Sequence, residues 1–237
     1  MINDYHDRGF DIELWSSIPC TPWCKWNMRN AWRLGRKFKE KLLENQRESM
    51  TLIASFINIS DFVIGLGGNV SFEWPAFNEG WKVDMLEQYF NSSGNFIDVR
   101  FDGCAVGLVA SNGKLIMKPW RVKTTNANID RVLSPKRCTC VPGSHAPCSG
   151  RETSRSERYT DEFARLVIQS CGAVSNTPLC NRDASHNRPV AAVAVDSQLS
   201  PLRGGSDFSY AGDDGCYAAV AQSSQNASTA HREKYEP

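Results

Sequence analysis

The sequence predicts an α/β fold for residues 1–171, followed by a tail of low complexity over residues 172–237. Strand-like segments alternate with helical ones in the first part, which is the order expected of a sheet covered by helices. After residue 171 the chain is rich in Ser, Ala, Asn, Gly and Pro, with little hydrophobic periodicity. We therefore expect one α/β unit and a disordered tail, in which only PVAAVAVD (189–196) has the pattern of a strand.

The longest expected element is a helix that runs from about Asn30 to Ile64. Apolar residues recur at helical spacing along it, and Gly67-Gly68 provides a C-terminal stop. One straight helix of this length would span roughly 50 Å at about 1.5 Å per residue. Because helices this long rarely stay straight, we expect a bend or break near Asn45–Ser49.

The shorter elements continue the alternation. Strands are expected at residues 10–17, 69–75, 95–103 and 114–122, and helices at 82–90 and 158–171. Thr160 stands where an N-cap residue would begin the last of these helices.

Composition narrows the classes of protein to consider. The net charge of +1 provides no general attraction to nucleic acid, so any such attraction must come from local clusters. The N-terminus has no apolar signal region, and no stretch is long and apolar enough to span a membrane, which predicts an intracellular protein that is not secreted. The four glycosylation sequons would then be accidental, and the nine cysteines indicate thiols or a metal site rather than disulfides.

Two residues that could take part in catalysis lie at or just beyond the ends of predicted strands. Cys20 comes after the first strand, in SSIPCTPWCKW (16–26), and Glu73 lies near the end of NVSFEWP (69–75). In parallel α/β sheets, catalytic groups collect beyond the carboxyl ends of the strands. A thiolate can add to an electron-poor ring carbon while a neighbouring acid protonates the adjacent ring nitrogen. The alternatives are a small buried thiol in a turn for Cys20, and a capping or salt-bridging carboxylate for Glu73.

A series of segments places these two residues in a wider pattern. The series comprises Pro19-Cys20 followed by Thr-Pro-Trp, Phe72-Glu73-Trp74-Pro75 after Gly67-Gly68, DGCAVGL (102–108), KPWRVKTTN (118–126), RCTCVPGSHAPCSG (137–150) and the helix 159–171. In this order, covering about residues 9–171, it resembles the cytosine-5 DNA methyltransferases. The resemblance is closest to their compact phage-type relatives and to the domains within polyproteins of retrotransposons and other mobile elements.

The resemblance implies the second half of a Rossmann-like, class I methyltransferase sheet. It also implies that Cys20 is the nucleophile that attacks C6 of cytosine, that Glu73 acts at N3, and that Arg121 steadies the base or the thiolate. S-adenosylmethionine would be the methyl donor, and the base would be flipped from a duplex or presented in a single strand. The loop is also loosely similar to the Ser/Asp-Pro-Pro-aromatic loop of amino-methyltransferases, with Cys20 at the aromatic position.

The segment that holds the methyl donor in this family is a glycine-rich strand-turn-helix before the Pro-Cys motif. Only 18 residues precede Pro19, and they contain no such turn; Thr21 also replaces the usual glutamine. The expectation is thus a truncated methyltransferase-like protein of mobile-element origin that is inactive alone, and whether it is an enzyme stays open. The alternative is a nucleic-acid-binding module, with or without zinc, that performs no catalysis.

A basic and aromatic stretch follows Cys20. Tryptophans alternate there with basic residues, and the candidates for contact with DNA or RNA are Trp23, Lys25, Trp26, Arg29, Arg33 and Arg36. Such a surface suits phosphate contacts and base stacking. The alternative is a solvated helix face with its tryptophans in the core.

A second cluster has the composition of a zinc site. Its candidate ligands are Cys138, Cys140, His145 and Cys148. Their spacing differs from that of a zinc knuckle, and the C-x-C pair strains tetrahedral coordination. The alternative is a Pro/Gly-rich loop that carries incidental thiols.

Overall fold

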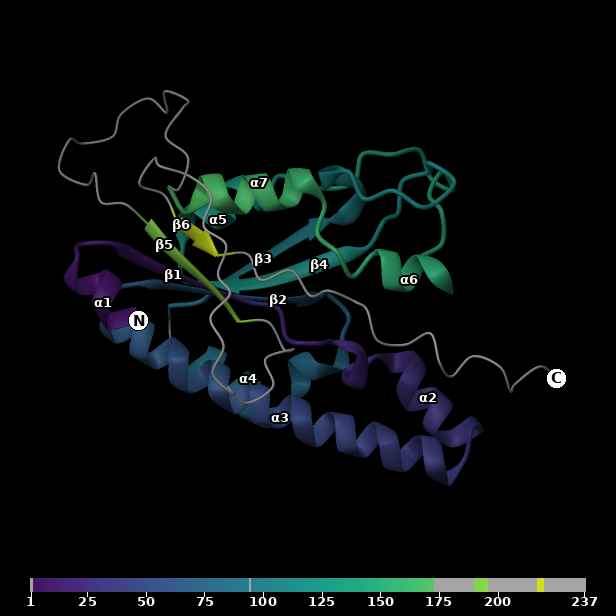
Figure 1. Ribbon diagram of the computed structural model, residues 1–237. Helices are drawn as coiled ribbons and strands as arrows, with labels where there is room; N and C mark the ends of the chain where they lie inside the picture. Colours follow the sequence, from purple (N-terminus) through teal and green to yellow (C-terminus); the bar gives the residue numbers. More distant parts are fainter. Residues whose placement is uncertain (1, 94, 173–189, 196–216, 220–237) are drawn as a thin grey trace.

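The computed structural model describes residues 2–93 and 95–172, together with the backbone of 190–195 and 217–219. Helices pack on both faces of one mixed sheet (Figure 1), so the α/β class is confirmed. We call the two faces the α3 face and the α7 face, after the main helix on each. The predicted disorder of 172–237 lies outside the described residues, apart from Gly172 and two short strands.

The sheet has six strands in the order β3-β4-β2-β1-β5-β6. They are β1 (Asp11–Ser16), β2 (Asn69–Pro75), β3 (Ile97–Asp102), β4 (Pro119–Thr124), β5 (Val190–Val195) and β6 (Tyr217–Ala219). β1 pairs in parallel with both β2 and β5, and β5 with β6, whereas β4 is antiparallel to both β2 and β3. The strand pattern of residues 189–196 is confirmed by β5.

The helices are α1 (Ile2–Asp7), α2 (Lys25–Arg33), α3 (Arg36–Gly65), α4 (Asp84–Ser92), α5 (Ala127–Leu133), α6 (Arg151–Arg155) and α7 (Asp161–Ser170). Three short 3-10 turns join them: η1 (Thr21–Trp23), η2 (Glu79–Lys82) and η3 (Gly103–Val106). None of the helices within the described ranges is both long and apolar enough to cross a membrane.

The α3 face holds an aromatic core. Phe56 of α3 packs against Phe72 of β2, with ring centroids 4.8 Å apart, and Phe72 lies 4.8 Å from Trp74. These side chains are almost completely buried, together with Ile12 and Leu14 of β1. Since successive strand residues point to opposite faces, this core uses the even-numbered residues of β1 and β2 and leaves Glu13, Trp15, Ser71 and Glu73 for the α7 face.

The break that the sequence predicts near Asn45–Ser49 is found instead at Gly35. α3 runs unbroken through Asn45–Ser49, and the chain instead breaks at Gly35, between α2 and α3. Gly35 has a φ of 78°, a left-handed conformation that glycine adopts without steric strain. Ser49 is buried in mid-helix, where its hydroxyl accepts a hydrogen bond from the Trp23 indole at 2.8 Å. This contact ties η1 to α3 at the place where a break was expected.

Of the other predictions of local structure, β2 and the Thr160 cap are confirmed, whereas the bounds of β4 differ and α5 was not predicted. β2 has the expected bounds, and Thr160 caps α7 by accepting a hydrogen bond from the Phe163 amide at 3.1 Å. The strand expected at 114–122 is shifted, because β4 begins only at Pro119. Helix α5 was missed, and its seven residues are too few for a clear apolar stripe.

We predict that Phe56→Ala lowers the free energy of unfolding by about 3–5 kcal/mol, because it leaves a cavity in the aromatic core. Phe62→Ala on the same helix is the control: the Phe62 side chain is 44% exposed, whereas that of Phe56 is 1% exposed. The control should change this free energy by less than about 1 kcal/mol. Chemical denaturation of both variants measures the difference, and equal losses would contradict the core assignment.

Candidate functional site

The structure brings Cys20 and Glu73 together at the carboxyl ends of two parallel strands. Ser16 at the end of β1 pairs with Phe72 of β2, so Glu73 lies one residue beyond the last pair. Cys20 follows four residues after Ser16, at the start of η1. The Asn78 side chain donates a hydrogen bond to the Cys20 carbonyl at 2.9 Å and so holds this loop against the segment that follows β2.

The Cys20 thiol is protonated at neutral pH. Burial raises its pKa to about 12, with a further contribution from the negative charge of Glu73, while the positive charge of Lys118 acts in the opposite direction. A thiol becomes a strong nucleophile only as the thiolate. Cys20 is therefore in position but not activated in this structure.

Glu73 is a buried carboxyl held by a tyrosine. Its side chain is 5% exposed, and the Tyr159 hydroxyl donates a hydrogen bond to Glu73 Oε2 at 2.7 Å. The Trp15 indole N–H in turn donates to the Tyr159 hydroxyl at 3.1 Å. Burial raises the pKa of Glu73 to about 7, against the lowering effect of the Tyr159 hydrogen bond and of Lys118. Near neutral pH this carboxyl is thus poised to hold or release a proton.

Lys118 is the cation whose charge lowers the pKa of both Cys20 and Glu73. It stands just before β4, its Nζ donating to the Ser156 carbonyl at 2.6 Å and lying 5.5 Å from the centroid of the Trp120 ring. The sequence prediction had assigned the basic role to Arg121. Lys118 belongs to the same KPWRV segment, but nothing in the sequence shows which of the two basic residues faces Glu73.

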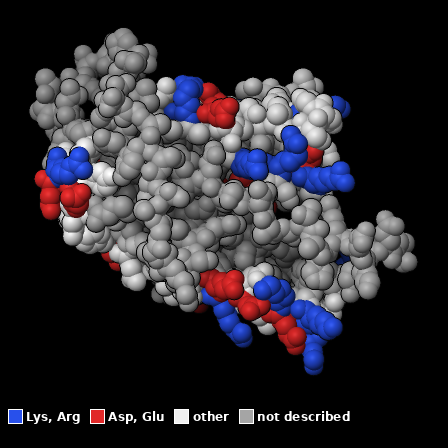
Figure 2. Space-filling model, viewed as in Figure 1, with Lys and Arg blue, Asp and Glu red and all other residues white. Residues whose placement is uncertain are grey.

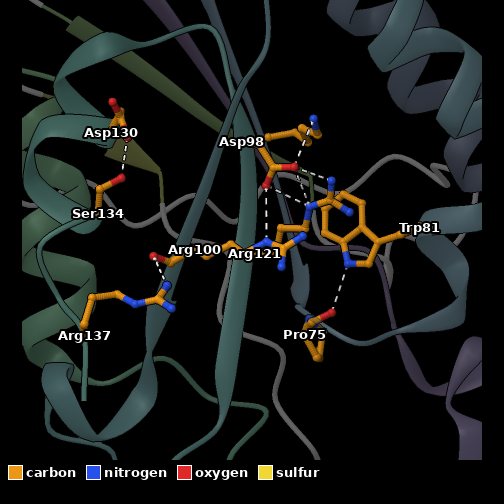
Figure 3. Close-up of polar contacts among 9 residues, drawn as sticks. Pro75, Trp81, Asp98, Arg100, Arg121, Asp130, Ser134 and Arg137 are labelled. Atoms are coloured by element: carbon orange, nitrogen blue, oxygen red, sulfur yellow. Dashed lines mark hydrogen bonds and ion pairs between the residues drawn. The ribbon is translucent and has the colours of Figure 1, made fainter. Parts of the chain in front are cut away.

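The structure places Arg121 on the opposite face of the sheet. Arg121 pairs with Trp74 across the β2–β4 ladder, whereas Glu73 pairs with Val122, so the side chains of Arg121 and Glu73 point to different faces. The guanidinium of Arg121 is hydrogen-bonded to Asp98, with Nε 2.9 Å from Oδ1, and lies 4.6 Å from the centroid of the Trp81 ring (Figure 3). Arg121 therefore fastens η2 to the sheet edge and does not join Cys20 and Glu73.

A second buried carboxyl, which the sequence did not single out, lies on the same face as Glu73. Glu13 accepts a hydrogen bond from the Asn126 side chain at 2.9 Å, and the Ser71 hydroxyl lies 3.5 Å from its other oxygen. Burial raises the pKa of Glu13 to about 7, opposed by these hydrogen bonds. The α7 face thus holds two carboxyls with raised pKa values on neighbouring strands.

Helix α2 and the start of α3 form a hairpin that we call the α2–α3 tip (residues 25–41). No residue of α2 is buried, and the side chains of Trp26 and Trp32 are 67% and 89% exposed. Arg29 lies over the Trp26 ring at 5.7 Å from its centroid. Figure 2 shows Lys and Arg side chains at this end of the molecule, with acidic ones among them.

The six candidate contact residues divide into three groups. Trp26, Arg29 and Arg33 are exposed, and within the described ranges neither arginine has an acidic partner. Lys25 and Arg36 are exposed but lie 3.2 Å from carboxylate oxygens of Glu79 and Glu40. Trp23 is half-buried and bonded to Ser49, so its role is packing.

Four potential metal ligands gather beyond the carboxyl end of β3, the strand at the outer edge of the sheet. The ligand atoms of Cys104, Cys138, Cys140 and His145 all lie within 4.8 Å of one another, and Cys138 Sγ is 3.5 Å from His145 Nε2. This Cys3His cluster could bind a metal ion such as zinc. It corrects the predicted set in one place, because Cys148 lies outside it, with its Sγ 3.3 Å from the Ser156 hydroxyl. Cys104, in DGCAVGL, takes its place.

The described residues do not fit S-adenosylmethionine. A glycine-rich turn that receives it must leave room beside the backbone. Within the described ranges, glycines directly follow a strand only at β3, where Gly103 and Gly107 flank the short turn η3. Beside Gly103 that space is filled by the protein itself, because a Cβ there would meet the Leu108 side chain at 2.8 Å and the Lys118 carbonyl at 3.1 Å. The space beside Gly107 is open, but Gly107 ends η3 and no helix follows it before β4.

We predict that the free energy of unfolding falls as the pH rises from about 4.5 to about 7, because Glu13 and Glu73 hold a proton in the folded state that they lose in the unfolded chain. The stabilisation is fully present below the ordinary pKa of glutamate and is lost as the pH passes about 7, on the order of 3 kcal/mol for each carboxyl. Denaturation at about pH 5 and about pH 8 measures it.

Glu13→Gln and Glu73→Gln should each remove part of this pH dependence. Glu44→Gln, at an exposed position on α3, is the matched control and should leave it unchanged. A wild-type protein that is equally stable at both pH values would contradict the raised pKa values.

Comparisons with known proteins do not assign a function, so the geometry of the described residues is the basis for doing so. No protein-family model matches the sequence, and no curated protein or solved structure is significantly similar to it.

Proposed function

We propose that residues 9–171 form the base-binding half of a cytosine-5-methyltransferase-like domain, which holds an unstacked pyrimidine between Cys20 and Glu73. The observation that carries the proposal is the position of this thiol and this carboxyl at the ends of adjacent parallel strands. The order β1-β2-β4-β3, with its antiparallel outer pair, is compatible with the half sheet that the resemblance implies.

Glu73 has the properties needed to recognise the ring nitrogen of cytosine. With a pKa of about 7 the carboxyl is partly protonated near neutral pH and can donate a hydrogen bond or a proton to N3. Its buried surroundings strengthen such a bond, because the competing water is excluded. A fully ionised carboxylate would only accept hydrogen bonds and could not serve this role.

Cys20 would supply the nucleophile. Attack forms a bond between Sγ and C6 of the ring. The π electrons of the C5–C6 double bond then form a double bond between C4 and C5, those of the C4–N3 double bond move to N3, and N3 takes the proton of Glu73. The thiol proton must first pass to water at this half-buried residue, which is unfavourable at a pKa of about 12. The positive charge of Lys118 favours the thiolate form of Cys20. Protonation of Glu73 removes its negative charge and so favours the thiolate further.

Tyr159 has to move before a base can bind. Its hydroxyl satisfies Glu73 in this structure, and its ring packs against Phe163 with centroids 4.7 Å apart. A pyrimidine that reaches Glu73 would replace the tyrosine hydroxyl as its hydrogen-bond partner. The site is thus closed in the structure and would open by displacement of the Tyr159 side chain.

The α2–α3 tip supports a nucleic-acid ligand. It starts directly after the Cys20 loop, since Cys24 is the N-cap of α2. Exposed tryptophans beside Arg29 and Arg33, which have no acidic partner in the part of the chain that the structure describes, suit base stacking and phosphate contact, and together they favour a single strand. Phe77, 68% exposed and next to the Asn78 that holds the Cys20 loop, extends this aromatic surface toward the site.

A second candidate function is nucleic-acid binding by the same tip without chemistry at Cys20. The protonated, half-buried thiol and the closed position of Tyr159 favour it. Because the described residues do not fit S-adenosylmethionine, methyl transfer under the first candidate function requires a donor site formed by residues other than these.

We predict that a single-stranded oligonucleotide containing 5-azacytosine forms a covalent adduct with the wild-type chain. In this base, nitrogen replaces C5, so that addition of the thiol to C6 is completed by a proton on N5 and needs no methyl donor. Denaturing gel electrophoresis and mass spectrometry detect the adduct.

The adduct should disappear in Cys20→Ser and persist in Cys24→Ser, which alters a neighbouring half-buried thiol. Glu73→Gln should slow its formation at least tenfold, since the proton donor is lost. An adduct that survives Cys20→Ser excludes Cys20 as the nucleophile. Absence of any adduct in a wild-type chain that binds the oligonucleotide would establish the second candidate instead.

We predict that Arg29→Gln with Arg33→Gln weakens binding of single-stranded DNA and lowers the slope of log K against log salt by about 1.4, the value for two phosphate contacts. Trp32→Ala should weaken binding by about 1–3 kcal/mol through lost stacking. Fluorescence anisotropy across a salt series measures both. Arg131→Gln, on α5 at the other face, is the control. Equal affinity for wild type and the double variant would reject the tip as the binding surface.

A further inference from the structure

The Cys3His cluster joins two parts of the chain that are distant in sequence. Cys104 lies in η3, directly after β3, while Cys138, Cys140 and His145 lie in the segment 134–150 between α5 and α6. We propose that these four residues bind a structural zinc ion, which fastens the segment 134–150 to η3. This zinc site does not rest on the proposed function.

The distances fit tetrahedral zinc. With Zn–S and Zn–N distances of about 2.3 and 2.0–2.1 Å, ideal tetrahedral angles place a sulfur and a nitrogen ligand about 3.6 Å apart and two sulfurs about 3.8 Å apart. The observed Cys138 Sγ to His145 Nε2 distance is 3.5 Å, and the largest separation among the four ligand atoms is within 4.8 Å. Shifts of side chains alone can close the remaining gap.

The backbone brings the ligands together by two local devices. The Cys138 amide donates a hydrogen bond to Asp102 Oδ2 at 2.8 Å, which places this cysteine beside η3. Between Cys140 and His145 the chain reverses at Val141-Pro142-Gly143-Ser144, where the Ser144 amide donates to the Val141 carbonyl at 3.1 Å. Gly143 has a φ of 80°, as the third position of a type II turn after proline requires. The turn returns His145 to the two cysteines.

The chemistry of the four ligands favours zinc over other metal ions. Three thiolates and one imidazole are soft ligands that suit zinc and disfavour magnesium or calcium, which take oxygen ligands. Four protein ligands complete a tetrahedron and leave no position for water, which is the arrangement of a structural rather than a catalytic zinc.

The segment 134–150, which the ion would hold, has little other stabilisation. Residues 134–150 form no helix or strand, and Ala146 is its buried apolar residue. A segment with so little apolar burial gains little from the hydrophobic core, and metal coordination supplies folding free energy directly.

The cluster and the segment that carries Tyr159 are both held by η3. η3 carries Cys104 and, two residues on, Val106, whose carbonyl accepts a hydrogen bond from the Thr160 hydroxyl at 2.6 Å. Thr160 follows Tyr159 and caps α7. An ion that immobilises η3 therefore also steadies the residue beside Tyr159.

The test is the metal content of the full chain, purified without added zinc or chelator. Mass spectrometry of the elements should find about one zinc per chain, and cobalt(II) exchanged into the protein should show the absorption of a tetrahedral thiolate site. Cys104→Ser and His145→Ala should each lose the stoichiometric zinc. Cys148→Ser is the matched control and should keep it, because Cys148 lies outside the cluster.

His145→Ala separates loss of metal from loss of the fold, since this half-buried side chain lies on the loop rather than in the core. Its circular dichroism in the helical region should equal that of the wild type while its zinc is lost. The proposal is overturned by a folded wild-type chain that binds no zinc when zinc is titrated into it, by a disulfide among these cysteines in place of the ion, or by zinc that is lost in Cys148→Ser and kept in Cys104→Ser.

Discussion

The parallel pairing of β1 with β2 is the constraint on which the candidate site depends. The connection between the two strands passes through η1, α2 and α3, and α3 covers one face of the sheet. The aromatic contact between Phe56 of α3 and Phe72 fixes how β2 lies. Once Ser16 is in register with Phe72, the Cys20 loop and Glu73 have to meet at one edge of the sheet. The same register sends Phe72 and Trp74 into the core on one face and leaves Glu73 for the other.

The α7 face is where burial acts on ionisable groups. Glu13 and Glu73 lie under helices instead of in water, and burial raises the pKa of each carboxyl to about 7. Hydrogen bonds from Asn126 and Tyr159 satisfy their oxygens without supplying a positive charge. The charge of Lys118 lowers the pKa of Glu73 but does not outweigh the effect of burial, so both carboxyls are partly protonated near neutral pH. That property distinguishes Glu73 from a carboxylate that serves only to form a salt bridge.

The sequence was sufficient where a signal is local or repeats along an element. It predicted the α/β class, β2, the Thr160 cap and the position of Cys20 and Glu73 after neighbouring strands. It failed where the answer depends on which face a side chain takes: Lys118 and Arg121 are three residues apart, and the strand pleat sends Arg121 away from Glu73. Cys104 was missed because it reaches Cys138 only through the fold. Gly35 was passed over as a break because the helical pattern continues on both sides of it.

Tyr159 connects the two sites physically. Its hydroxyl closes the Cys20–Glu73 site, and its neighbour Thr160 is held by η3, which also carries Cys104 of the metal cluster. Under the proposed function, a base enters only if Tyr159 moves while Thr160 keeps capping α7. Rotation of the tyrosine side chain is then a smaller change than displacement of the whole segment. A zinc ion that fixes η3 would favour this smaller motion by holding Thr160 in place. The ion would then confine opening of the site to one side chain, although it lies outside the site itself.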